Sequence, residues 1–234
     1  MDSRPYYRES RAVVLLSGGM DSCVCAALAA RDHENVAALH ISYGQRTETR
    51  ERESFFAVCD RLGIRQRLMV RNEALKLIGG SALTDEKIAV PESHLLGRDI
   101  PVTYVPFRNA HFLAAAVSWA EVLGASKIYI GAVEQDSSGY PDCRPAYYQA
   151  FNQVIKAGTK EGSIEVVTPL IAMRKAEIVR FGLELGAPLD LTWSCYSRED
   201  RACGVCDSCV LRLRAFEEAG ASDSLPYAPV AHVV

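Results

Sequence analysis

The 234-residue sequence predicts an α/β protein, a doubly wound and mostly parallel sheet with a small C-terminal zinc-binding segment. Three observations predict this class. Short apolar runs alternate with segments of helical periodicity, which is typical of βαβ units. A glycine-containing turn follows the first apolar run, and half of the eight cysteines cluster near the C-terminal end.

The expected elements follow the apolar pattern in chain order. Residues 12–16 form an unbroken apolar run, typical of a strand covered on both faces, and residues 20–30 are apolar almost all round, as in a buried helix. The remaining pattern predicts strands at 36–42, 65–70, 127–131 and near 166–167, and helices at 47–62, 109–123, 146–157, 174–185 and 210–219.

The predicted organisation is one α/β domain over residues 1–187 and a zinc-binding segment with a polar tail over residues 188–234. Residues 71–105 break the strand–helix rhythm, because they carry several glycines and prolines and no sustained period. We predict a long loop there, with the hypothesis that it closes over a functional site.

Composition and charge exclude several classes of protein. Hydrophobic residues make up 49% and charged residues 24%, with 26 basic against 29 acidic side chains, so the chain is globular and no broadly basic nucleic-acid surface is expected. No apolar run reaches the ~18 residues of a membrane span, and the first ten residues lack the apolar run of a signal peptide. We therefore expect a cytoplasmic protein, in which thiols stay reduced.

The string Ser17-Gly18-Gly19-Met20-Asp21-Ser22 lies between the first strand and the first helix. Glycines let the backbone approach a ligand closely, and the amides and dipole at a helix start favour phosphate. The string lacks the lysine of GxxxxGK[ST] and the spacing of GxGxxG, which disfavours kinase-type chemistry and dinucleotide binding. A tight turn that binds nothing is the alternative interpretation.

The cysteine cluster consists of Cys195, Cys203, Cys206 and Cys209. The last three form two overlapping Cys-x2-Cys steps, and four thiolates complete a tetrahedral zinc shell, so we predict a closed, structural zinc site. An iron–sulfur cluster is the alternative for the same sulfurs. The other cysteines are interpreted separately, with Cys23, Cys25 and Cys59 as core residues and Cys143 left open as a possible nucleophile.

The glycine string resembles the PP-loop of the N-type ATP pyrophosphatases, which cleave ATP between the α- and β-phosphates and transfer AMP to an oxygen. Further strings occur in the order found in the QueC family of queuosine biosynthesis, and with the loop they span residue 12 to about residue 220. They are Tyr43-Gly44-Gln45-Arg46, Val105-Pro106-Phe107-Arg108-Asn109, Ser138-Gly139-Tyr140-Pro141-Asp142-Cys143-Arg144-Pro145 and Thr192-Trp193-Ser194-Cys195-Tyr196.

The resemblance implies ATP-dependent conversion of 7-carboxy-7-deazaguanine and ammonia to 7-cyano-7-deazaguanine, through an adenylated carboxylate and an adenylated amide. It implies ATP, Mg²⁺, one structural Zn²⁺ per chain and a homodimer. The implied ATP-binding residues are Leu16, Ser17, Gly18, Gly19, Met20, Asp21, Ser22, Cys23, Val24, Cys25 and Ala26. The implied catalytic residues are Ser17, Asp21, Ser22 and Arg108. The implied substrate-binding residues are Arg46, Arg108, Asn109, Asp136, Tyr140, Asp142 and Arg144.

Two alternatives remain open at this point. One is a related PP-loop ligase that passes an adenylated acyl group to another acceptor, an amine or tRNA. The other is a zinc-ribbon interaction module whose glycine turn is inert.

Overall fold

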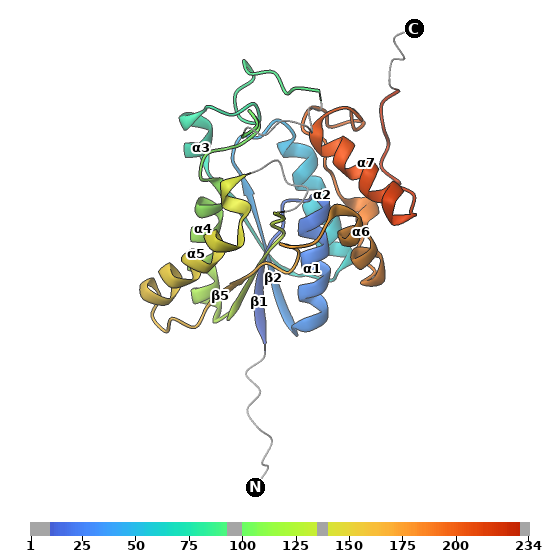
Figure 1. Ribbon diagram of the computed structural model, residues 1–234. Coiled ribbons are helices and arrows are strands. Elements are labelled where there is room, and N and C mark those ends of the chain that lie inside the picture. Colours follow the sequence, from blue (N-terminus) through green and yellow to red (C-terminus); the bar gives the residue numbers. More distant parts are fainter. Residues whose placement is uncertain (1–9, 93–99, 135–139, 230–234) are drawn as a thin grey trace.

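A single parallel sheet forms the centre of the molecule (Figure 1), in a computed structural model that describes residues 10–92, 100–134 and 140–229. Its strand order is β3-β2-β1-β4-β5. The strands are β1 (Arg11–Leu15), β2 (Asn35–Ser42), β3 (Gln66–Arg71), β4 (Lys127–Ile130) and β5 (Glu165–Val167). The helices are α1 (Met20–Asp32), α2 (Glu48–Arg61), α3 (Glu73–Ile78), α4 (Arg108–Leu123), α5 (Pro145–Gly158), α6 (Lys175–Glu184) and α7 (Asp207–Ala219).

Helices cover both faces of the sheet, as Figure 1 shows. Side chains from α1, α2, α6 and α7 pack on the face that carries Ala12 and Val14, and side chains from α4 and α5 pack on the face that carries Val13 and Leu15. Successive residues of a strand point to opposite faces of the sheet. Because helices cover both faces, the residues that point to either face must be apolar. The predicted fold class and the interpretation of residues 12–16 as a doubly covered strand are therefore confirmed.

The strand order reverses between β1 and β4, since β2 and β3 extend the sheet on one side of β1 and β4 and β5 on the other. In open α/β sheets, such a switch point leaves a crevice at the carboxyl ends of the strands, where ligands bind. The loop after β1 and the residues after β4 both lie at this position.

The prediction of a long loop over residues 71–105 was wrong in part, because α3 occupies Glu73–Ile78. Six residues are too few to show a helical period in the sequence. The helix is held by Leu75, which is 1% exposed and packs with Tyr43, Leu83 and Val105. Residues 93–99 of this segment lie outside the described residues, so the closing hypothesis stays a prediction.

The C-terminal residues are tied to the main layer by apolar packing. Ala215 and Phe216 of α7 share the core that α1 and α6 build, and Trp193 forms a separate, smaller core with the cluster cysteines and Leu225. The expected boundary at residue 187 stays a prediction. None of the helices in the described parts of the chain is long and apolar enough to cross a membrane.

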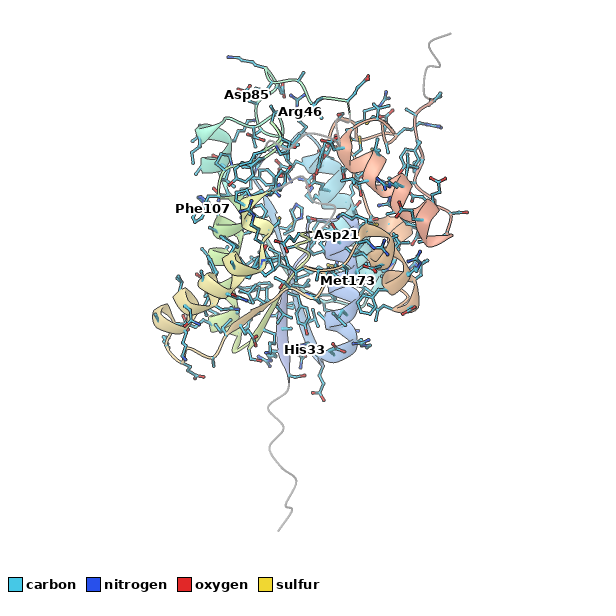
Figure 2. The ribbon with its side chains drawn as sticks, in the orientation of Figure 1. Asp21, His33, Arg46, Asp85, Phe107 and Met173 are labelled. Atoms are coloured by element: carbon cyan, nitrogen blue, oxygen red, sulfur yellow. The ribbon has the colours of Figure 1, made fainter. Side chains whose placement is uncertain are left out.

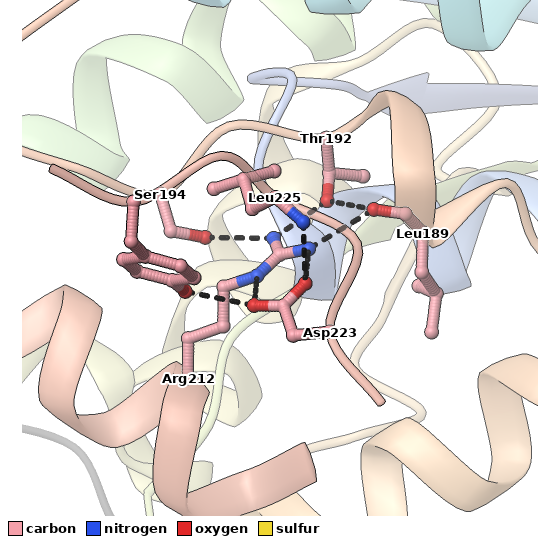
Figure 3. A network of polar contacts seen from close by, with 7 residues as sticks. Leu189, Thr192, Ser194, Arg212, Asp223 and Leu225 are labelled. Atoms are coloured by element: carbon pink, nitrogen blue, oxygen red, sulfur yellow. Dashed lines mark hydrogen bonds and ion pairs between the residues drawn. The ribbon is translucent and has the colours of Figure 1, made fainter. Parts of the chain in front are cut away.

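Arg212 of α7 is the centre of a buried polar network (Figure 3). Its guanidinium donates to both carboxylate oxygens of Asp223 at 2.8 and 3.0 Å, and also to Thr192, Ser194 and the Leu189 carbonyl. Burial raises the pKa of Asp223, but the hydrogen bonds from Arg212 and Tyr227 more than offset this, so the pKa lies below its usual value. The stabilisation is thus present at neutral pH and is lost as the pH falls through that lowered pKa.

We expect Asp223→Asn to lower the free energy of unfolding by about 3–5 kcal/mol, because it leaves the Arg212 charge buried without its counter-ion. The matched control is Glu218→Gln, which breaks the exposed pair with Arg214 on the same helix and should change stability by less than about 0.5 kcal/mol. Urea unfolding followed by circular dichroism measures both. Equal effects of the two variants would contradict a stabilising role for the network.

Candidate active site

A pocket of about 300 Å³ lies over the carboxyl ends of β1, β2 and β4. Its walls come from the loop after β1, the start of α2, the start of α4, and the C-terminal residues around Trp193 and Arg212. Figure 2 shows Asp21 near the middle of the molecule, beside the strand ends, with Arg46 and Asp85 together at one end. The pocket thus lies at the switch point of the sheet.

The phosphate loop, residues 17–22, is shaped by its own hydroxyl groups. The Ser17 and Ser22 hydroxyls lie 3.0 Å apart, the Gly19 amide donates to Ser17 Oγ, and Ser22 Oγ donates to the Gly19 carbonyl. Helix α1 begins at Met20, directly after Gly19 as its N-cap, so its first-turn amides and its positive dipole end are at the pocket. This is an anion-binding geometry of the kind that holds phosphate groups.

The backbone of the phosphate loop approaches its neighbours with no room for a side chain. Gly18 has φ +95°, and a Cβ there would lie 2.4 Å from the Glu51 carbonyl oxygen. A Cβ on Gly131, after β4, would lie 2.8 Å from the Ser22 nitrogen. The Trp193 amide donates to the Gly18 carbonyl at 2.8 Å. Three distant segments therefore fix the position of this loop.

Asp21 and Lys175 form an ion pair inside the pocket, with Lys175 Nζ 2.5 Å from Asp21 Oδ2. The other carboxylate oxygen, Asp21 Oδ1, is buried and has no hydrogen-bond partner among the described residues. A free carboxylate oxygen beside a phosphate loop fits Mg²⁺, which takes few protein ligands and shares substrate phosphates. Lys175 lies at the start of α6, outside every sequence motif that predicted a site residue.

Arg108, the first residue of α4, lies in the pocket wall and forms no ion pair among the described residues. It donates to the Tyr43 hydroxyl at 3.0 Å, and its charge lies 5.6 and 5.8 Å from the ring centres of Tyr43 and Phe112. Burial raises the pKa of Tyr43 to about 12, so this hydroxyl stays neutral. A guanidinium is always charged, and a charge away from water needs a partner, so this part of the pocket favours an anionic ligand group.

Asn109 and Asp142 bind to each other. The Asn109 amide donates to Asp142 Oδ2 at 3.2 Å, and the Asn109 side chain donates to the Asp142 carbonyl. Asp142 is 4% exposed, and its carboxylate caps the start of α4 through the bond from the Asn109 amide. Neither Asp142 nor Arg144 lines the pocket. Tyr140 does line it, with its hydroxyl 2.9 Å from the Thr103 hydroxyl. Asp136 lies outside the described residues.

Arg46 holds the segment after α3. Its guanidinium donates to the carbonyl oxygens of Ala82, Asp85 and Ile88 at 2.7 to 3.0 Å. Arg46 also lines the pocket, so its predicted contact with substrate stays a prediction beside this structural role.

The expected ATP-binding residues divide into two groups. Leu16, Ser17, Gly19, Met20, Asp21 and Ser22 line the pocket. Cys23, Val24, Cys25 and Ala26 are 0% exposed in the core, so their side chains do not reach it. Cys23, Cys25 and Cys59 are core residues as predicted.

Cys143 lines the pocket, but its environment does not favour a nucleophile. Burial raises the pKa of its thiol to about 11. Because the thiolate is the reactive form, the thiol at neutral pH is a weak nucleophile.

The cluster cysteines come together as the spacing predicts, with all four sulfurs within 4.8 Å of one another. Cys203 Sγ and Cys209 Sγ are 3.8 Å apart, which is the edge of a tetrahedron with metal–sulfur bonds of ~2.3 Å. Backbone amides of Ser197 and Cys203 donate to Cys195 Sγ, and the Cys206 amide donates to Cys203 Sγ. The donor set therefore fits a structural metal ion.

The fold and the pocket together define the class: a parallel α/β protein with an anion-binding loop at the switch point of its sheet. A family model described as "Queuosine biosynthesis protein QueC" matches residues 11–220, and the chain belongs to this family. The family prediction is thereby confirmed.

Curated relatives match nearly the full chain. A 7-cyano-7-deazaguanine synthase from Koribacter versatilis is 72% identical over 94% of this chain and 94% of its own length. A 7-cyano-7-deazaguanine synthase from Chlorobaculum tepidum is 60% identical over 93% of this chain and 96% of its own length. Among solved structures, NMN synthetase from Francisella tularensis has a TM-score of 0.49 and 15% identity, covering 93% of this chain and 79% of that chain.

Gly131→Ala should displace the start of α1, because its new methyl group collides with backbone atoms that cannot move aside. We expect a loss of about 1–3 kcal/mol in unfolding free energy, from overpacking, together with weaker binding of inorganic pyrophosphate. Gly158→Ala, at the end of α5 with nothing within 4 Å, is the control and should be neutral or stabilising. Calorimetry gives both quantities, and identical behaviour of the two variants would refute the close approach.

Proposed function

We propose that this protein uses ATP to convert 7-carboxy-7-deazaguanine and ammonia to 7-cyano-7-deazaguanine, and that its pocket is the active site. The observation that carries the proposal is the pairing of an anion-binding loop with Arg108 in one pocket. The loop suits the phosphates of ATP, and Arg108 suits the carboxylate that must meet them. The names of the curated relatives support the substrate and the product.

The first step joins the two ligands. A carboxylate oxygen of the substrate attacks the α-phosphorus, the bond from that phosphorus to the pyrophosphate oxygen breaks, and an acyl adenylate forms. The amides at the start of α1 stabilise the charge that develops on the departing pyrophosphate. Arg108 orients the attacking carboxylate, and the neutral Tyr43 hydroxyl holds the guanidinium.

The remaining steps replace oxygen by nitrogen. Ammonia attacks the acyl carbon, AMP leaves as the carbon–oxygen bond breaks, and the nitrogen loses a proton, which gives the amide. The amide oxygen then attacks the α-phosphorus of a second ATP, and pyrophosphate leaves again. Loss of both nitrogen-bound protons and cleavage of the carbon–oxygen bond release AMP and leave the nitrile. The second activation is needed because dehydration of an amide in water requires a good leaving group on oxygen.

Two metal ions complete the proposal. Asp21 Oδ1 would hold Mg²⁺, which neutralises charge between the phosphates when bound. Cys195, Cys203, Cys206 and Cys209 would hold one structural Zn²⁺ per chain. The proposal also includes a homodimer and a cytoplasmic location, which rest on the family resemblance.

Mass spectrometry of a mixture of protein, ATP, Mg²⁺, 7-carboxy-7-deazaguanine and ammonium should detect the nitrile, AMP and pyrophosphate. Arg108→Met should lower kcat/KM by about 10- to 100-fold, the usual range for a hydrogen bond to a charged group. Arg31→Met, in the last turn of α1 and 57% exposed, is the control and should retain activity. ADP as product, or transfer of the acyl group to another acceptor, would contradict the proposal.

Cys206→Ser should lower the zinc content, measured by elemental analysis, from about one ion per chain and reduce the melting temperature, because the remaining thiolates leave the shell incomplete. Cys143→Ser is the matched control and should keep the full zinc content, since Cys143 is not in the cluster. Iron with labile sulfide in the wild type would favour the cluster alternative, and metal-free wild type with unchanged stability of the variant would refute the site.

A further inference from the structure

We propose that Glu51 recognises the guanine-type edge of the substrate, accepting hydrogen bonds from its ring N–H and its 2-amino group. The inference rests on the proposed function and names the residue that would select a deazaguanine over other carboxylic acids. Glu51 lies in the first turn of α2, outside the motifs that carry the family resemblance.

The Glu51 carboxylate lines the pocket and forms no ion pair among the described residues, although the positive charge of Arg108 acts on it from elsewhere in the pocket. Its Oε2 accepts from Gln45 Nε2 at 2.9 Å, and its Oε1 accepts from Thr47 Oγ1 at 2.8 Å. Each oxygen is therefore held by one neutral donor. An ionised carboxylate has about four lone-pair sites, so each oxygen keeps capacity for a further hydrogen bond.

The two donors fix the direction of this carboxylate. Gln45 is 5% exposed and accepts from the Tyr43 amide at 2.8 Å, which sets the orientation of its side-chain amide. Thr47 is 2% exposed and is the N-cap of α2. A carboxylate supported in this way loses little rotamer freedom when a ligand binds, which favours affinity.

The chemistry of the edge selects the ligand. A guanine-type edge presents two adjacent N–H donors, which match two parallel carboxylate oxygens in a bidentate contact. The corresponding edge of adenine presents one donor beside an acceptor nitrogen, which would face a carboxylate oxygen unfavourably. Glu51 therefore suits the deazaguanine better than the base of ATP.

The other acids have different partners. Asp21 and Glu51 are the acidic residues among the described residues that line the pocket, and Asp21 is paired with Lys175. Asp142 does not line the pocket and binds the Asn109 amide. Glu51 and Arg108 thus offer one acceptor group and one cation in the same pocket, as a ligand with an N–H edge and a carboxylate requires.

Burial gives further support to this assignment. It raises the pKa of Glu51, against the opposing effects of the hydrogen bonds from Gln45 and Thr47 and of the Arg108 charge. The free pocket therefore holds the carboxylate in an unfavourable environment, which ligand N–H donors would relieve.

The test measures binding of 7-carboxy-7-deazaguanine and of its analogue without the 2-amino group by calorimetry, in the absence of ATP. We expect Glu51→Gln to weaken binding of the acid by about 10- to 100-fold, since it replaces one acceptor by a donor that faces the ligand N–H groups. The wild type should prefer the acid over the analogue, and Glu51→Gln should lose that preference. A residue that only supported the fold would not change this ratio.

Glu53→Gln is the matched control, on the same helix but 57% exposed and paired with Arg50, and it should bind like the wild type. Glu51→Asp keeps the carboxylate and should retain the preference with an intermediate affinity. If circular dichroism shows that Glu51→Gln does not fold, the preference of Glu51→Asp for the acid over the analogue decides whether Glu51 recognises the substrate edge.

Two outcomes would overturn the assignment. One is that Glu51→Gln keeps the preference for the acid over the analogue. The other is that Glu51→Gln leaves binding of the acid unchanged and instead alters the KM for ATP or the Mg²⁺ requirement. Nitrile formation by the wild type is measured separately. If the wild type makes the nitrile and Glu51→Gln still prefers the acid over the analogue, Glu51 is wrongly assigned and the proposed function stands. If the wild type neither binds the acid nor makes the nitrile, both fail.

Discussion

The structure depends on one constraint, the close approach of the phosphate-loop backbone to three segments far apart in the chain. Gly18 lies against the backbone of α2, Gly131 lies behind the start of α1, and the Trp193 amide binds the Gly18 carbonyl. No side chain separates these backbones, so a small displacement of any one segment moves the amides that would face phosphate. The sheet, α2 and the C-terminal residues therefore jointly set the geometry of the anion site.

The pocket carries two opposite charges, on Arg108 and Glu51, that are not joined in an ion pair among the described residues. Arg108 is held by a neutral hydroxyl and two aromatic rings, and Glu51 is held by an amide and a hydroxyl. A charged group away from water is stabilised by a partner of opposite polarity, so the two groups together favour a ligand that pairs with both. Asp21 and Lys175, in contrast, already form an ion pair through Asp21 Oδ2, which leaves Asp21 Oδ1 as the oxygen that a cation would use.

The C-terminal residues act on the site through ordinary packing and capping contacts. Glu199 accepts from the Thr49 and Arg50 amides at the start of α2, and the Arg50 guanidinium lies 4.8 Å from the centre of the Trp193 ring. Arg212 binds Asp223 in the interior. A metal ion held by the cysteine cluster would fix the segment that contains Trp193 and, through it, Gly18. This gives a physical reason for a structural metal site so close to a phosphate loop.

Local sequence patterns determined most of the secondary structure, the phosphate loop and the cysteine cluster, because each depends on neighbours within one turn, one strand or one short spacing. They did not reveal α3, whose six residues depend on the burial of Leu75. These patterns predicted a substrate contact for both Arg108 and Asp142, but Arg108 lies in the pocket and Asp142 caps a helix. Lys175 and Glu51 were found only in the tertiary structure. Their partners in the pocket come from segments far apart in the chain, and no periodicity or motif encodes which polar side chains the folded backbone will place around the same cavity.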